Sequence, residues 1–260
     1  MFLPVRDENP TLDASVATIA LIGLNVFAWV FIQGLGFDEA RLTASVCRLG
    51  AIPGVLLGNH AEAAALAAQL DSPCPIAPTA DWATVITSMF MHAGWLHLIG
   101  NMWFLWVFGD NVEDAMGHMR FGVFYVLCGL AAFFAQALAD PVSPVPMVGA
   151  SGAIGGTLGA YARLYPRARV HVLGVFLFFF RRFVVPAAVV LGLWFLLQIV
   201  SGFPGLGTSA AGGVAFWAHA GGFLTGLVLV GFFTDPERLA LHEVHRLGRH
   251  HRPERDESWR

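Results

Sequence analysis

Residues 149–165 read GASGAIGGTLGAYARLY, and this stretch decides how many times the chain is expected to cross a membrane. A spanning helix needs about 20 mostly apolar residues. The apolar part here, residues 151–165, is shorter and contains four glycines. Such a segment can lie at membrane depth only where neighbouring helices enclose it. We therefore expect it to form the centre of a helix bundle.

The composition indicates that the whole chain belongs in a membrane. Of its 260 residues, 56% are hydrophobic and 13% are charged, whereas a typical globular chain is about 25% charged. The net charge of −3 gives no indication of a nucleic-acid partner. Besides the glycine-rich stretch, five apolar segments are candidate spans: residues 14–34, 96–109, 121–139, 186–200 and 214–233.

The basic residues predict the orientation of these spans. All 15 are arginines, and loops on the cytoplasmic side of a membrane carry an excess of positive charge. With six spans and a cytoplasmic N-terminus, only Arg41 and Arg48 lie outside. Without the glycine-rich span, the later loops would change sides and this pattern would be lost. The sequence thus predicts an all-α polytopic membrane protein, a six transmembrane helix bundle with a short central fourth helix and a cytoplasmic N-terminus.

This topology divides the chain into three parts. Residues 1–13 form a cytoplasmic N-terminus, and residues 14–234 form the six-helix membrane domain. Residues 235–260 form a cytoplasmic tail that we expect to be solvated and partly disordered. Within the membrane domain, residues 35–83 are predicted to form a long outer loop with amphipathic segments.

Two loops carry further expectations. Residues 169–185 are apolar but interrupted by Arg181 and Arg182, which is typical of a re-entrant or interfacial loop on the inner side. Cys47 and Cys74 both lie in the outer loop, where an oxidising compartment would permit a disulfide. Two free thiols are an equally open alternative.

Strongly polar side chains inside the spans are the candidate functional residues, because burying them in a bilayer is costly. His97 and Asn101 are four residues apart and therefore share one face of the second span. Ser151 opens the fourth span, and His219 lies near the start of the sixth. These three spans all begin at the predicted outer face. Each polar residue thus lies within about two turns, or roughly 10 Å, of that face.

The chemistry of these residues is that of nucleophilic catalysis. A serine hydroxyl becomes a nucleophile when a neutral imidazole can accept its proton, so Ser151 is the predicted nucleophile and His219 the general base and acid. The developing oxyanion needs hydrogen-bond donors. His97, Asn101 and the Ser151 backbone N–H, at a helix N-terminus, are the predicted oxyanion hole. His92, at the preceding loop junction, is assigned structural support.

Contact between the serine and the histidine requires the fourth and sixth spans to pack closely. Gly152 and Gly156 in one span, and Gly222 and Gly226 in the other, have the small-xxx-small spacing that allows helix backbones to approach. Gly149, two residues before the serine, is assigned the same supporting role. The sequence therefore predicts a glycine-lined crossing beside the dyad.

Three motifs follow one another along the chain: Met91-His92…His97-xxx-Asn101, Gly149-Ala150-Ser151-Gly152 and Ala218-His219-xx-Gly222-xxx-Gly226. In these motifs the sequence resembles the rhomboid family of intramembrane serine proteases, in its bacterial six-span form. The similarity extends over about residues 4–235. One departure is in the outer loop, where many relatives have a Trp-Arg pair and Trp82 has no arginine beside it.

The resemblance implies a Ser–His dyad without a third acidic member, and an enzyme that needs neither a cofactor nor a metal. It implies that the substrates are single-span membrane proteins, cut near the outer boundary of the membrane within a helix that unwinds easily. It also implies a multi-pass protein of the bacterial inner (plasma) membrane, surrounded by lipid, with the active site toward the outer leaflet.

Two other classes of function compete with this interpretation. A non-catalytic binder would use the same groove to hold membrane helices, and Ser151→Ala would leave its function intact. A transporter would place polar sites in both leaflets, whereas the four polar residues cluster in one. Other intramembrane proteases are disfavoured because the sequence has no His-Glu-x-x-His zinc motif and no paired membrane aspartates.

Overall fold

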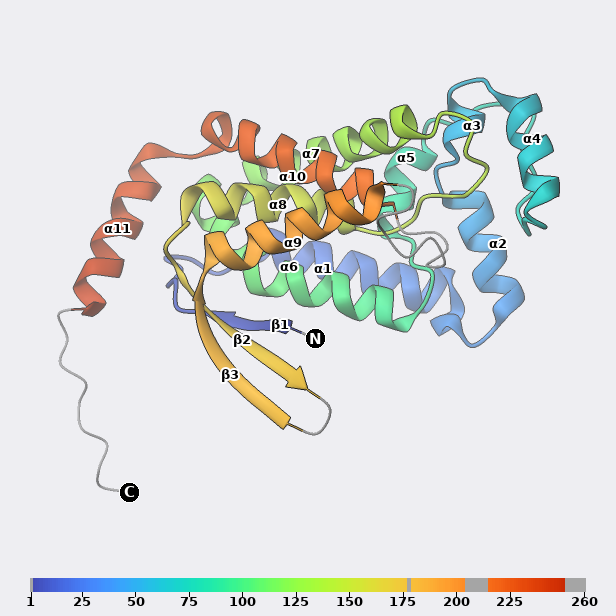
Figure 1. Cartoon of the computed structure of the whole chain (residues 1–260). Helices are drawn as coiled ribbons and strands as arrows, with labels where there is room; N and C mark the ends of the chain where they lie inside the picture. The colour runs from blue at the N-terminus through green and yellow to red at the C-terminus, as the bar shows by residue number, and fades with distance from the viewer. Residues whose placement is uncertain (1, 177–178, 204–214, 251–260) are drawn as a thin grey trace.

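The computed structural model describes residues 2–176, 179–203 and 215–250. Long helices lie side by side in a bundle (Figure 1). They are α1 (Val16–Phe27, continued by the π-helix η1, Ala28–Ile32), α6 (Trp95–Met116), α7 (His118–Ala139), α8 (Ser151–Leu164), α9 (Ala187–Gly202) and α10 (Phe216–Phe233).

Helix α8 lies in the middle of the bundle, in contact with α6, α7, α9 and α10 (Figure 1). All of residues 152–161 are buried. The glycines allow this enclosure, because a Cβ on Gly156 would lie 2.4 Å from the Cβ of Cys128, and one on Gly159 would lie 2.0 Å from the Phe223 carbonyl oxygen. The prediction of a short, enclosed helix is confirmed.

Among the described residues, α7 and α10 are long and apolar enough to cross a membrane, judged by length and composition. Helix α9 and the α1–η1 pair are apolar but shorter. Buried helices of soluble proteins pass the same test, so two such helices are weak evidence by themselves. The six-span count and the orientation stay predictions.

Helix α6 continues about two turns beyond its predicted end at residue 109. The acidic residues that resembled the end of a span are buried instead. The Glu113 carboxylate accepts hydrogen bonds from the N–H groups of Ala17 (2.8 Å) and Thr18 (2.7 Å), and Asp114 accepts others from the segment before α1. The first N–H groups of a helix have no intrahelical acceptor and favour a negative charge. These acids therefore attach the start of α1 to the end of α6.

A three-stranded antiparallel sheet contradicts the all-α prediction. Strands β1 (Phe2–Asp7), β2 (Arg169–Phe176) and β3 (Phe179–Pro186) pair in that order. The segment predicted as a re-entrant or interfacial loop thus contains two paired strands, and its place relative to a membrane stays a prediction. Val170 and Val172 are buried on one face of β2, which is the alternation of a half-buried strand. The N-terminal residues, predicted only as a cytoplasmic segment, supply the edge strand β1.

The predicted outer loop contains several short helices at the end of the bundle away from α11 (Figure 1). They are η2 (Gly34–Gly36), α2 (Glu39–Leu49), α3 (Pro53–Leu56) and α4 (His60–Gln69), and α5 (Thr84–Thr87) and η3 (Ser88–Phe90) follow. Helices α8 and α10 begin at this same end of the bundle (Figure 1).

The first part of the predicted tail forms α11 (Pro236–His250), which follows α10 almost directly. Asp235 accepts a hydrogen bond from the Glu237 N–H at 3.0 Å, and proline is favoured at the first position of a helix. His242 is buried against the ring of Tyr165. The rest of the tail, residues 251–260, lies outside the described residues.

Candidate active site

Ser151 and His219 form a hydrogen-bonded pair, with the serine Oγ 2.8 Å from the histidine Nε2. Ser151 is the first residue of α8, and His219 lies in the first turn of α10. Both residues therefore belong to helix starts, and α8 and α10 begin at the same end of the bundle (Figure 1). The spacing suits proton transfer from a nucleophile to a base.

The backbones of α8 and α10 approach each other closely beside this pair. A Cβ on Gly222 would lie 2.0 Å from the Gly152 carbonyl oxygen, and one on Gly226 would lie 1.9 Å from the Gly156 carbonyl oxygen. The two glycine pairs thus face each other across the helix crossing. Larger residues would push the helices apart and separate the hydroxyl from the imidazole.

Gly149 shapes the entry of the chain into α8. Its φ of +118° lies in a region that L side chains rarely adopt. A Cβ there would also lie 2.6 Å from His97 Nε2 and 3.4 Å from Asn101 Nδ2. Glycine is required at this position for both the turn and the close approach of these two side chains.

His97 and Asn101 present hydrogen-bond donors beside the serine. The Ala93 N–H donates to His97 Nδ1 at 3.4 Å, which leaves the ring proton on Nε2, the atom that faces Gly149. Asn101 is buried, and its Nδ2 has no hydrogen-bond partner among the residues that the structure describes. The Ser151 N–H belongs to the first turn of α8, where amides lack an intrahelical acceptor. Among the described residues, the Asn101 Nδ2 donor is therefore free for a ligand.

All four side chains line one cavity of about 960 Å³. Its inner wall comes from α6, α8, α9 and α10, and its outer wall from α2 and from the segment after α4. Apart from His97 and His219, the ionisable side chain on its described lining is Glu39. Within the described ranges, no group of three His, Cys, Asp or Glu side chains is placed to hold a metal ion.

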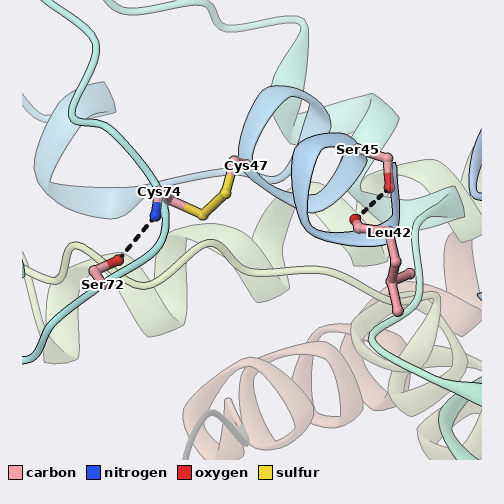
Figure 2. The surroundings of a disulfide bond; sticks show 5 residues. All are labelled: Leu42, Ser45, Cys47, Ser72 and Cys74. Atoms are coloured by element: carbon pink, nitrogen blue, oxygen red, sulfur yellow. Dashed lines mark hydrogen bonds between the residues drawn. A yellow bond between two sulfur atoms is a disulfide. The ribbon is translucent and has the colours of Figure 1, made fainter. Parts of the chain in front are cut away.

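A disulfide between Cys47 and Cys74 fastens this outer wall, which settles the alternative that the sequence left open. Figure 2 shows the bond joining α2 to the segment that follows α4, with the Ser72 hydroxyl accepting a hydrogen bond from the Cys74 N–H. Cys74 itself lines the cavity. The bond therefore holds together the two parts of the outer segment that line the cavity.

His92 is fully buried behind the site, with its ring 5.2 Å from that of His97. The Gln33 side chain holds its backbone from both sides, accepting from the His92 N–H at 2.8 Å and donating to its carbonyl oxygen at 2.7 Å. Burial, with a smaller contribution from His97, lowers the pKa of His92 to about 3. A neutral ring packed against His97 fits the supporting role predicted for this residue.

The sequence reasoning missed Gln198 on α9. Its Oε1 lies 2.8 Å from Nδ1 of His219, on the opposite side of the imidazole from Ser151. Trp194, one turn earlier, packs its ring 5.9 Å from the same imidazole. A signal was present, since Gln198 is the one amide in the predicted span 186–200 and polar groups in spans are functional hypotheses.

Comparisons with known proteins support the motif-based resemblance. A stretch of 76 residues is 41% identical to RHOMBOID-like protein 5 of Arabidopsis thaliana and covers 29% of this chain and 25% of that protein. Another, of 80 residues, is 39% identical to Rhomboid protease GluP of Bacillus subtilis and covers 31% and 15%. A longer match of 214 residues to RHOMBOID-like protein 1 of Arabidopsis thaliana is 26% identical and covers 82% and 50%. The matched region is therefore half or less of each relative.

The Rhomboid domain family matches residues 79–235, more than half of the chain. This range includes the helices that carry Ser151, His219, His97 and Asn101. Rhomboid proteins are membrane proteins, which agrees with the length and apolar character of α7 and α10. The chain belongs to the rhomboid family.

Proposed function

We propose that this protein is an intramembrane serine endopeptidase that hydrolyses peptide bonds in or next to the transmembrane segments of single-span membrane proteins. The observation that carries the proposal is the Ser151 Oγ to His219 Nε2 contact of 2.8 Å. The cavity around it also contains the Asn101 Nδ2 donor, which has no partner among the described residues. Some rhomboid proteins are inactive, and inactive relatives usually lack the serine or the histidine. This chain has both.

In the proposed reaction, Ser151 Oγ attacks the scissile carbonyl carbon while His219 Nε2 takes the hydroxyl proton. The carbonyl oxygen becomes an oxyanion, and His97 Nε2–H, Asn101 Nδ2–H and the Ser151 N–H donate hydrogen bonds to it. Collapse of this intermediate breaks the C–N bond, and His219 gives its proton to the leaving amine. An acyl-serine ester and a free amino terminus result.

Water completes the cycle by the same steps. His219 takes a proton from a water molecule, whose oxygen attacks the ester carbonyl, and the same donors hold the second oxyanion. The C–O bond to Ser151 then breaks, and the proton returns from His219 to the serine oxygen. The products are a carboxylic acid and the original enzyme, so the cycle balances without a cofactor.

The same proposal includes six membrane crossings, a cytoplasmic N-terminus and an active site in the outer leaflet of a bacterial plasma membrane. The arginine distribution supports this orientation. The Cys47–Cys74 disulfide supports it as well, because disulfides persist in oxidising compartments. Lipid surrounds the bundle, and the exposed apolar residues of α9, such as Leu193 and Leu197, fit that environment.

The test uses the purified protein in liposomes with a single-span reporter, comparing wild type with Ser151→Ala and His219→Ala. We expect wild type alone to cut the reporter within or beside its membrane segment, as read by product mass. A folded wild type that captures the reporter and leaves it intact, and whose Ser151 does not react with a fluorophosphonate, would support the client-binding function instead.

A further inference from the structure

Gln198 makes the other contact of the imidazole that the proposed mechanism uses. His219 has two ring nitrogens, and Nε2 faces Ser151 while Nδ1 faces Gln198 Oε1 at 2.8 Å. A neutral imidazole carries one proton, and only the nitrogen without it can accept the serine proton. Whatever fixes the proton on Nδ1 therefore prepares Nε2 to act as the base.

The orientation of the Gln198 amide is itself determined by a second contact. Its Nε2 donates to the Trp194 carbonyl oxygen, one turn earlier on α9, at 3.4 Å. Turning the amide over would bring its oxygen against that carbonyl oxygen, placing two acceptors in contact. The amide oxygen therefore faces His219, and this oxygen can only accept a hydrogen bond. It follows that Nδ1 carries the proton.

We infer that Gln198 is a positioning residue that holds His219 in the tautomer with Nδ1 protonated, so that Nε2 is free to accept the Ser151 proton. The inference rests on the proposed dyad and adds a third, neutral member from a helix that supplies neither catalytic group. Trp194 assists by packing against the imidazole ring, with an angle of 35° between the planes. Two side chains one turn apart on α9 thus fix both the proton and the plane of the base.

An amide in this place acts differently from the carboxylate of a triad. A carboxylate would also stabilise the positive charge that His219 gains during the reaction, whereas an amide oxygen supplies only its dipole. Gln198→Glu therefore keeps the acceptor and adds charge, and Gln198→Met keeps the length and shape of the chain but removes the strong acceptor. These two variants separate hydrogen bonding from packing.

The experiment measures reporter cleavage and fluorophosphonate labelling of Ser151 from pH 5 to 9 for wild type and both variants. Gln198→Met is expected to lower kcat about tenfold, the rate equivalent of one neutral hydrogen bond, with KM unchanged. Gln198→Glu is expected to keep most of the rate at high pH. Its acid limb should move to higher pH because the carboxylate stabilises the imidazolium. Glu39 and His97, the other ionisable groups lining the cavity, are present in all three proteins and cannot cause a difference.

Two results would overturn the inference. One is a Gln198→Met enzyme with wild-type kcat and pH limbs. The other is an equal loss in both variants with unchanged pH limbs, which would reduce Gln198 to a packing role. The tautomer can also be determined without an activity assay, from the imidazole ¹⁵N chemical shifts of labelled protein. The His219 signals are those present in the wild-type spectrum and absent from that of His219→Ala. A signal with the proton on Nε2 would refute the assignment. Failure of wild type itself to cleave or label would instead refute the proposed protease function.

Discussion

Replacing Gly222 by alanine should destabilise the bundle and slow cleavage through one backbone contact. The added Cβ would lie 2.0 Å from the Gly152 carbonyl oxygen, whereas ordinary contact begins at 3.4 Å. The obstructing atom is backbone and cannot rotate away, so α8 and α10 must separate by more than about 1 Å. Overpacking of this kind costs about 1–3 kcal/mol, and we expect the upper end here. The higher helix propensity of alanine offsets about 1 kcal/mol of this loss in stability.

Gly122 on α7 provides the matched control, because a Cβ there would meet no atom within 4 Å. Gly122→Ala should therefore be stabilising by about 0.5–1 kcal/mol. The two variants should differ by about 3 kcal/mol in the free energy of unfolding, measured by denaturant titration in one detergent. Gly222 lies one turn from His219, and a displacement of about 1 Å can cost about a hundredfold in rate. Equal stability and equal cleavage rates in the two variants would show that the helices do not cross as closely as described.

Three more predictions address other parts of the molecule. Cys47→Ser removes a disulfide that links residues separated by 27 positions, and it should lower the free energy of unfolding by about 3 kcal/mol. Wild type in reductant should show the same loss. An unchanged free energy of unfolding in the variant would contradict the bond. Asn101→Ala should lower kcat about a hundredfold or more. Stability should change little, because the Asn101 Nδ2 donor has no partner to lose among the described residues. An unchanged kcat would show that Asn101 is not part of the oxyanion hole. Burial raises the pKa of Asp7 to about 6, despite a hydrogen bond from Tyr161. The folded protein thus retains a proton on Asp7 that the unfolded chain loses above about pH 4, so the contribution of Asp7 to stability should fall between about pH 4 and 6. The stability of wild type relative to Asp7→Asn should therefore decrease across this range, and a constant difference between the two proteins would refute the cause.

The central helix and the site could be predicted because both depend on local spacing. Small residues at four-residue intervals fit a helix crossing regardless of the rest of the fold, so Gly152, Gly222 and Gly226 indicated the crossing. Ser151 and His219 could be placed at one depth from the helix starts alone. Whether the two side chains touch depends on the close approach of α8 and α10, which glycine permits because a Cβ on Gly222 would lie 2.0 Å from the Gly152 carbonyl oxygen.

The parts that were missed depend on partners far away in the sequence. Strand β1 pairs with β2 across more than 160 residues, with Leu3 opposite Leu173, and no local pattern announces such a partner. Glu113 resembles the end of a span because it is charged, yet its carboxylate caps α1, about 95 residues earlier. In both cases a contact with residues far away in the sequence determines the local structure, and the hydrophobicity of the segment alone predicts that structure incorrectly.

The helices that form the site are buried to different extents. Helix α8 is buried along most of its length and is locked to α10 by glycine contacts, so the distance between the nucleophile and the base is set by rigid backbone. On α9 only Ala187 and Leu191 are buried, both in its first half, while Gln198 lies near its other end. The contact of Gln198 with Nδ1 of His219 therefore depends on α9, whereas the distance between Ser151 and His219 depends on the α8–α10 crossing.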